Sequence, residues 1–101
     1  MNDAKTGFEF LKNEYVLNHT IATFSKPIVA ILDGIVMGGG AGISVHAPFR
    51  VATENTIFAM PENSIGYFPD VGSSFFLSRL MDLPFGLYLG LTGKRIMSSD
   101  T

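Results

Sequence analysis

The sequence of 101 residues contains no cysteine and no tryptophan, and only 16% of its residues are charged. Without cysteine the chain forms no disulfide and offers no thiolate as a nucleophile or metal ligand. The formal net charge is −2, so electrostatics give no reason to expect a nucleic acid or an anionic membrane as a partner. Asp33, Arg50 and several glycines interrupt the apolar runs well short of membrane-spanning length. The sequence therefore argues against thiol chemistry, nucleic-acid binding and a membrane-spanning helix.

Metal-ligand patterns and targeting signals are missing as well. The two histidines, His19 and His46, lie far apart, and no group of His, Asp and Glu has metal-ligand spacing. We expect no metal, and we interpret His46 as a capping or packed core histidine rather than as a base. Residues 1–5 match neither a signal peptide nor an Arg-rich transit peptide.

Apolar surface, in contrast, is abundant. Hydrophobic residues make up 47% of the chain, and the mean hydropathy is +0.30. A chain of this length has too little volume to bury so much apolar surface. This excess of apolar surface indicates either a missing partner or missing sequence, and the length allows at most one domain in residues 1–101.

Five of the eleven glycines fall within residues 34–42. They follow the apolar run Ile28–Leu32, which predicts a strand covered on both faces, and lead into a short helix predicted over about residues 40–46. Glycine permits a sharp turn and close approach to a main-chain N–H, and free N–H groups at a helix start favour negative charge. The cluster has neither the ending of a Walker A loop nor the spacing of a dinucleotide fingerprint. An oxyanion hole is the functional interpretation, and tight packing of a helix on a strand is the structural alternative.

The remaining sequence alternates helices and short strands, which predicts an α/β fold with tight connections and strands stacked in successive layers. The predicted elements are a helix over about Gly7–Phe24, strands at Phe49–Ala52 and Ile57–Met60, an irregular stretch over 62–72, helices at Ser73–Met81 and Phe85–Leu91, and the lead-in to a further helix over 96–100.

Two acids in the irregular stretch are candidate catalytic groups. Glu62 follows Pro61 directly after an apolar strand, and Asp70 follows Pro69 after a second apolar approach. Burial among such neighbours raises a carboxyl pKa and suits it to acid–base chemistry near neutral pH. The alternatives are that Glu62 is a solvated turn residue and that Asp70 caps the helix beginning near Gly72.

Several stretches together resemble a known superfamily. Lys26–Ala30, Gly34–Gly40 and Phe58–Glu62 are similar to the crotonase, or enoyl-CoA hydratase/isomerase, superfamily, and residues 37–46 and 65–72 resemble more closely its 3-hydroxyisobutyryl-CoA hydrolases. The resemblance covers essentially the whole chain. It implies a partial crotonase-like spiral of ββα units and acyl-CoA thioester substrates, with no cofactor besides the coenzyme A that is part of the substrate.

The resemblance also assigns roles to four residues. It implies that Gly39 supplies the second of two backbone amides that bind the thioester oxygen, and that Glu14 contacts the substrate. It makes Glu62 the catalytic glutamate and Asp70 the acid that distinguishes the hydrolases.

The sequence departs from the superfamily in two ways. Hydratases carry a second catalytic glutamate two residues after the last glycine of the cluster, where this chain has Gly42, so hydration by paired glutamates is not expected. The chain is also much shorter than family members. The resemblance implies that residues 1–101 are a single incomplete crotonase-like domain, the central part without the N-terminal strands and C-terminal helices. We expect the first oxyanion amide to lie upstream of Met1, so that the isolated chain is an inactive fragment.

The expected function is hydrolysis of a short β-hydroxyacyl-CoA, with Glu62 as nucleophile or as general base. The alternatives are an enoyl-CoA isomerase or hydratase, or a non-catalytic subunit with a crotonase fold. The resemblance implies a place in valine degradation, and a mitochondrial location in a eukaryote or a cytoplasmic one otherwise. An oligomer could form through the rest of the domain.

Overall fold

The computed structural model describes residues 3–80 and 82–100. Helices and strands alternate along it, as predicted for an α/β fold. The helices are α1 (Asp3–Ala22), α2 (Gly39–Ser44), α3 (Ser73–Arg79) and α4 (Leu83–Thr92), with 3-10 helices η1 (Glu62–Ile65) and η2 (Ser98–Asp100); the strands are β1 (Val29–Leu32), β2 (Ile35–Met37), β3 (Phe49–Ala52), β4 (Ile57–Ala59) and β5 (Ile96–Met97).

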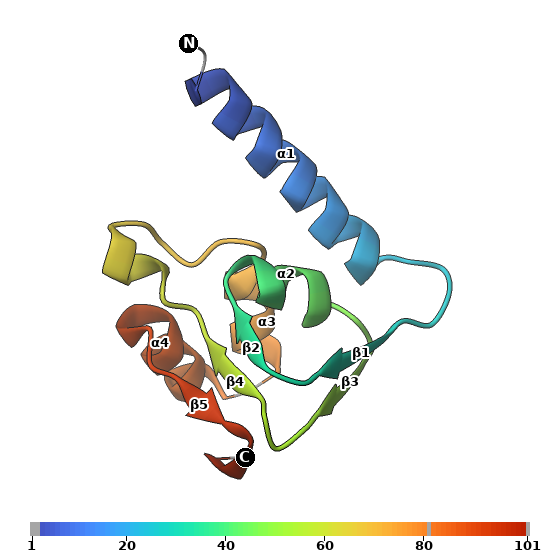
Figure 1. Cartoon of the computed structure of the whole chain (residues 1–101), viewed down its shortest axis with the longest axis vertical. Helices are drawn as coiled ribbons and strands as arrows, with labels where there is room; N and C mark the ends of the chain where they lie inside the picture. Colours follow the sequence, from blue (N-terminus) through green and yellow to red (C-terminus); the bar gives the residue numbers. More distant parts are fainter. Residues whose placement is uncertain (1–2, 81, 101) are drawn as a thin grey trace.

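The strands stack in two successive layers, as the tight connections predicted (Figure 1). β1 pairs in parallel with β3, beginning at Val29 opposite Phe49, and β2 pairs in parallel with β4, beginning at Ile35 opposite Ile57. The chain therefore runs through a strand, a corner, a second strand and helix α2, and then repeats the strand–corner–strand path directly beside the first. This arrangement is a ββα spiral, and it places the end of β2 next to the end of β4.

Two strands were not predicted. β2 has only three residues between Gly34 and Gly38, which is too short for a periodic pattern. β5 has two residues and pairs antiparallel with β4, so the prediction that residues 96–100 lead into a further helix is wrong at Ile96 and Met97. Tertiary pairing, which local sequence does not encode, decides both segments. The end predicted for the third helix, Met81, lies outside the described residues.

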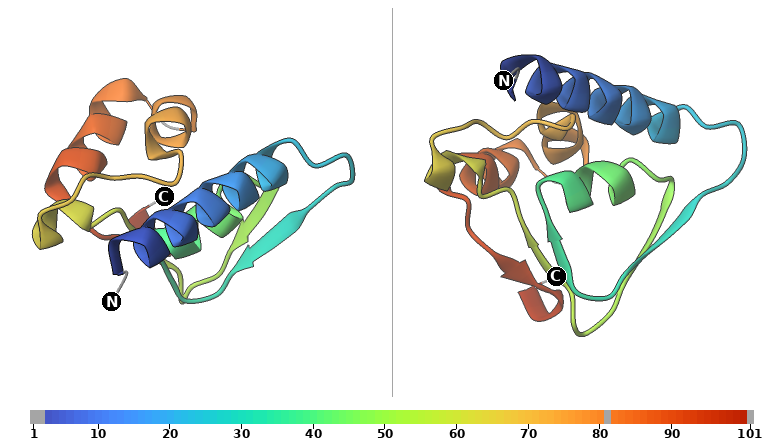
Figure 2. Two further views of the ribbon diagram at one scale, coloured as in Figure 1. Left: turned by 90° about the horizontal axis from the view of Figure 1, so that it is seen from above. Right: turned by 45° about the horizontal axis from the view of Figure 1, so that its top comes forward.

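Helix α1 runs as a long rod across the molecule and packs against α2 (Figure 2). The buried face of α1 does not follow the apolar residues, because Phe8, Tyr15 and Leu17 are exposed, whereas the polar Asn18 is only 5% exposed. The reason is the glycine composition of α2: a Cβ on Gly42 would lie 3.0 Å from the Asn18 Oδ1 atom. Because Gly39 and Gly42 of α2 have no side chains, α1 approaches along its Glu14–Asn18 edge.

The core lies between α2, β2, β4, α3 and α4. It consists of Val36, Ala41, Val45, Met60, Val71, Phe76, Leu77 and Leu89. Leu32 of strand β1 packs against this core, but the outer face of the strand does not, with Val29 58% and Ile31 71% exposed. The prediction that this strand is covered on both faces is therefore wrong for the described chain, which offers no element to cover its outer face. Among residues 3–80 and 82–100, no helix combines the length and hydropathy needed to cross a membrane.

Candidate active site

The predicted glycine turn joins β2 to α2. Gly38 precedes the first helical residue and has a φ of 51°, a conformation that glycine adopts without the steric cost other residues incur. Two carboxylates lie against this turn. A Cβ on Gly38 would be 3.3 Å from Glu62 Oε1, and a Cβ on Gly39 would be 2.9 Å from Glu14 Oε1. The backbone of the turn therefore carries no side chains at these two positions, with Glu62 next to Gly38 and Glu14 next to Gly39.

Glu62 lies at the start of η1, one residue after Pro61, where strand β4 has ended. It is only 8% exposed, so the prediction of a solvated turn residue is wrong. Neither carboxylate oxygen has a hydrogen-bond partner within the described part of the chain. Burial raises the pKa of Glu62 most; its own backbone N–H acts in the opposite direction, and the negative charge of Asp70 adds to the rise. A carboxyl group in this setting is suited to exchanging protons near neutral pH.

Asp70 lies on the segment between η1 and α3, and it does not cap α3. The residue before α3 is Gly72, and no side chain caps that helix. The Asp70 carboxylate accepts a hydrogen bond of 2.8 Å from the Tyr15 hydroxyl of α1 instead. The capping alternative is therefore wrong, and the side chain of Asp70 is free of a structural role in α3.

Glu14, the neighbour of Tyr15 on α1, completes the group. Burial raises the pKa of Glu14, and the negative charge of Asp70 raises it further. Because Asp70 acts electrostatically on both glutamates, the three acids form one interacting cluster beside the Gly38–Gly39 turn. The structure thus brings together all four residues predicted from sequence, from four separate segments. No group of three or more His, Asp or Glu side chains within the described ranges has the geometry of a metal site.

Gly42 explains why a hydratase-type second glutamate does not fit. A Cβ on Gly42 would lie 2.7 Å from the Val71 Cβ, closer than real carbon contacts allow. Gly42 itself is buried. A glutamate at this position would displace Val71, so position 42 has no room for a second glutamate in this structure.

His46 is packed, as predicted. Its Nε2 lies 2.7 Å from the carbonyl oxygen of Val71, and its ring makes an edge contact with Phe76. It therefore holds the backbone next to Asp70 and takes no place among the carboxylates.

Two residues near the site escaped sequence reasoning. The sequence pattern gives no role to Tyr15 or Asn18, yet Tyr15 donates a hydrogen bond to Asp70 and Asn18 is buried against α2. The one feature of the local sequence that could have indicated a role for Tyr15 is that it directly follows Glu14, a candidate substrate-contacting residue. This feature becomes informative only once the tertiary structure shows that α1 packs against the glycine turn.

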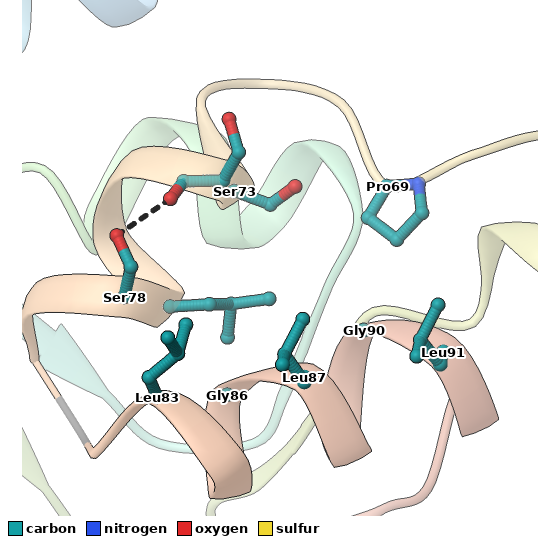
Figure 3. Close-up of a pocket in the computed structure, with 10 residues that line it drawn as sticks. Pro69, Ser73, Ser78, Leu83, Gly86, Leu87, Gly90 and Leu91 are labelled. Atoms are coloured by element: carbon teal, nitrogen blue, oxygen red, sulfur yellow. Dashed lines mark hydrogen bonds between the residues drawn. The ribbon is translucent and has the colours of Figure 1, made fainter.

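The cleft between α3 and α4 is a different kind of surface (Figure 3). Its volume is about 240 Å³, and leucine side chains and small residues line it. The lining residues are Pro69, Ser73, Ser74, Leu77, Ser78, Leu83, Gly86, Leu87, Gly90 and Leu91. None of these side chains titrates near neutral pH, so the described lining of the cleft holds no candidate acid–base group.

The fold and the site together define a class of protein, and comparisons with known proteins agree. The structure superimposes with a TM-score of 0.91 on a crystal structure of an enoyl-CoA hydratase from Rhodobacter sphaeroides, at 42% identity, over 98% of this chain and 29% of that one. The profile of the enoyl-CoA hydratase/isomerase family matches residues 1–101. The chain belongs to this family, and its ββα spiral is part of a crotonase fold.

Curated relatives are more similar still. The chain is 61% identical over 96 residues to probable 3-hydroxyisobutyryl-CoA hydrolase 3 of Arabidopsis thaliana, covering 95% of this chain and 25% of that protein. It is 60% identical over 92 residues to the mitochondrial 3-hydroxyisobutyryl-CoA hydrolase of Xenopus tropicalis, covering 91% and 24%. It is also 61% identical over 88 residues to small ribosomal subunit protein mS47 of Neurospora crassa, covering 87% and 17%. The chain thus spans about a quarter of the hydrolases and less of the ribosomal protein.

Proposed function

We propose that this chain forms the catalytic part of an acyl-CoA thioester hydrolase that acts on a short β-hydroxyacyl-CoA, with 3-hydroxyisobutyryl-CoA as the first candidate. The observation that supports this most is Glu62, a buried carboxylate without a hydrogen-bond partner in the described residues, set against a glycine turn. An unpaired buried charge is costly for folding, and such groups concentrate at functional sites. The names of the two hydrolase relatives supply the reaction.

In the proposed reaction the thioester carbonyl lies over the Gly38–Gly39 turn. The Gly39 N–H donates to the carbonyl oxygen and stabilises the negative charge that develops on it. Glu62 either attacks the carbonyl carbon or removes a proton from an attacking water. The carbon–sulfur bond then breaks, and coenzyme A leaves as the thiol once its sulfur has taken a proton. Where Glu62 is the nucleophile, water next cleaves the anhydride between Glu62 and the acyl group, which releases the hydroxy acid and restores the carboxylate. Asp70 orients the water or the β-hydroxyl, and Glu14 contacts the substrate. No cofactor besides the substrate's own coenzyme A takes part.

The name of the Xenopus relative includes "mitochondrial", and we extend this location and a place in valine degradation to the protein that contains this chain. Its substrate partner is an acyl-CoA thioester, and oligomers would form through surfaces outside these residues.

Two other functions compete with the proposal. An enoyl-CoA isomerase would use Glu62 alone as a proton shuttle, and the family match accommodates it. A non-catalytic structural protein is the second, because one relative is named as a protein of the small ribosomal subunit. The carboxylate cluster weighs against this second function, since a purely structural protein gains nothing from an unpaired buried glutamate.

The test uses a full-length hybrid, in which this chain replaces the matching quarter of the Xenopus tropicalis hydrolase. We expect the hybrid to release coenzyme A from 3-hydroxyisobutyryl-CoA and to leave the double bond of a short enoyl-CoA unmoved. Isomerisation without thioester cleavage would favour the isomerase, and a folded hybrid that neither binds coenzyme A nor cleaves the thioester would favour the structural protein. We expect the isolated chain to show no measurable hydrolysis.

A further inference from the structure

Asp70 is held from two sides by residues that the proposed reaction does not use. On one side, the Tyr15 hydroxyl of α1 donates to Asp70 Oδ2 at 2.8 Å, across 55 positions of sequence. No other donor in the described ranges contacts this carboxylate. On the other side, the backbone is fixed at the next residue, because the carbonyl oxygen of Val71 lies 2.7 Å from His46 Nε2.

The backbone beside Asp70 is also strained. Val71 has a φ of 50°, and it is the one non-glycine residue with a positive φ in the described part of the chain. A β-branched side chain is disfavoured in this region, and such strain persists only where the surroundings over-determine the conformation. Val71 is 2% exposed and belongs to the core. The conformation of Val71 and its contact with His46 fix the backbone from which the Asp70 side chain extends. The Tyr15 hydroxyl fixes the position of the carboxylate at the other end of that side chain.

We infer that Tyr15 is a positioning residue for Asp70: its hydroxyl holds one carboxylate oxygen so that the other faces the reacting group. A carboxylate on a connecting segment rotates about χ1 and χ2 unless a partner selects one orientation, and correct orientation of a catalytic group contributes directly to rate. This inference rests on the proposed function of Asp70. The structural alternative is that the bond only fastens α1 to the segment before α3.

The surroundings of the phenol agree with such a role. Its ring lies at the edge of an apolar hollow between α1 and residues 67–68, which Phe8, Leu11, Val16 and Phe68 help to line. Interaction with the Tyr67 side chain, burial and the Asp70 carboxylate raise the pKa of Tyr15. The phenol therefore stays protonated and remains a donor to Asp70 throughout the pH range of enzymatic activity.

The first arm of the test is a double-mutant cycle in the hybrid. We expect Tyr15→Phe to lower kcat for 3-hydroxyisobutyryl-CoA about tenfold, the loss typical of one hydrogen bond to a charged group, and to change KM less than about threefold. In the Asp70→Asn background the same substitution should change kcat less than about twofold, since coupled residues are not additive. Tyr88→Phe is the matched control, because Tyr88 is an exposed residue of α4, and it should leave kcat unchanged.

A structural role gives a different pattern. In that case Tyr15→Phe lowers the melting temperature by the same amount in both backgrounds, while kcat per folded enzyme stays at its parental value. That result overturns the inference but not the proposed function. If Asp70→Asn alone left kcat unchanged, that result would overturn the proposed role of Asp70.

The second arm needs no turnover. A 3-fluorotyrosine placed at position 15 of the hybrid reports phenol ionisation through its fluorine resonance. We expect Asp70→Asn to let this phenol ionise at lower pH, because removal of the carboxylate removes a charge that opposes phenolate formation. The same label at position 88 should not respond. An unchanged titration at position 15 would show that the bond to Asp70 does not form, and would overturn the inference even if the hybrid were inactive.

Discussion

Two carboxylates near strand ends, Asp33 and Glu62, are treated by this fold in opposite ways. Asp33 lies at the corner between β1 and β2, is exposed, and accepts hydrogen bonds from Thr53 Oγ1 at 2.6 Å and Asn55 Nδ2 at 3.0 Å. These bonds lower the pKa of Asp33, and the bond from Thr53 has the larger effect. Glu62 is buried, lacks a partner among the described residues, and has a raised pKa.

Asp33 therefore stabilises the fold through its hydrogen bonds, whereas Glu62 is buried without any such bond within the described residues. The corner of the first layer is fastened to the corner of the second through Asp33, and Thr56 adds a bond of 2.6 Å to the Leu32 carbonyl oxygen. Every one of these groups gains from folding. The Glu62 carboxylate has no hydrogen-bond partner among the described residues, which is why we propose that it serves chemistry with a ligand. Substitutions at the two places should therefore affect different measurements.

The largest expected effect is at Glu62. We predict that Glu62→Gln in the hybrid lowers turnover of 3-hydroxyisobutyryl-CoA about a hundredfold or more, because an amide neither attacks nor accepts a proton. The melting temperature at neutral pH should not fall, since a buried charge has been removed. Glu54→Gln in the exposed turn after β3 is the control. Near-normal turnover of the Glu62 variant would exclude a catalytic role.

At the glycine turn, we predict that Gly39→Val raises the barrier by on the order of 3 kcal/mol, as for loss of one oxyanion donor. The added side chain would push against Glu14 Oε1, which lies 2.9 Å from the Cβ position, whereas a Cβ on Gly40 meets nothing within 4 Å. Gly40→Val on the same helix is therefore the matched control. Steady-state kinetics of the two variants test the turn, and equal turnover would show that the glycines serve packing alone.

Asp70 should show a smaller loss. We predict that Asp70→Asn lowers hydrolysis about tenfold or more through loss of charge, a smaller loss than the roughly hundredfold or more expected for the general base itself. Stability should hardly change, since the Tyr15 hydroxyl finds an amide oxygen in place of the carboxylate. Asp82→Asn, at the start of α4, is the control. The measurement is kcat together with thermal melting, and unchanged hydrolysis would restore the isomerase as the better function.

The smallest effect on activity should come from the corner. We predict that Asp33→Ala leaves kcat unchanged and lowers the melting temperature modestly, because Thr53 and Asn55 lose their acceptor. Since the pKa of Asp33 is lowered on folding, its stabilisation is present above its ordinary pKa and is lost as pH falls through the lowered value. Melting curves from neutral to acid pH test this. A loss of turnover would contradict the separation of the two regions.

The same contrast explains what sequence reveals about this molecule. The glycine turn, Glu62 and Asp70 were predictable because short motifs carry them and because proline and glycine set their turns. The longer helices were predictable from apolar periodicity, with ends shifted by a few residues. β2 and β5 were not, because pairing with β4 rather than local pattern makes them strands.

The exposed outer face of β1, the burial of Asn18 and the bond between Tyr15 and Asp70 were also beyond sequence reasoning. Each depends on where distant elements lie. α1 approaches α2 only because Gly39 and Gly42 lack side chains, and that approach decides which residues of α1 are buried and which reach the carboxylates. The local sequence reveals which residue types form the site, whereas the orientation of these residues relative to one another depends on the tertiary structure.

The central claim is that Glu62 is a buried carboxylate kept for chemistry at a cost to stability. The most direct measurement is the difference in melting temperature between the hybrid and its Glu62→Gln variant from about pH 4 to pH 8, with coenzyme A release followed in the same samples. A carboxyl whose pKa is raised on folding costs nothing below its unfolded pKa and costs most above its folded pKa. We predict that the variant gains stability relative to the parent as pH rises through this window, while its turnover is lost. A pH-independent difference in melting temperature, or a variant that hydrolyses the thioester normally, would contradict the claim.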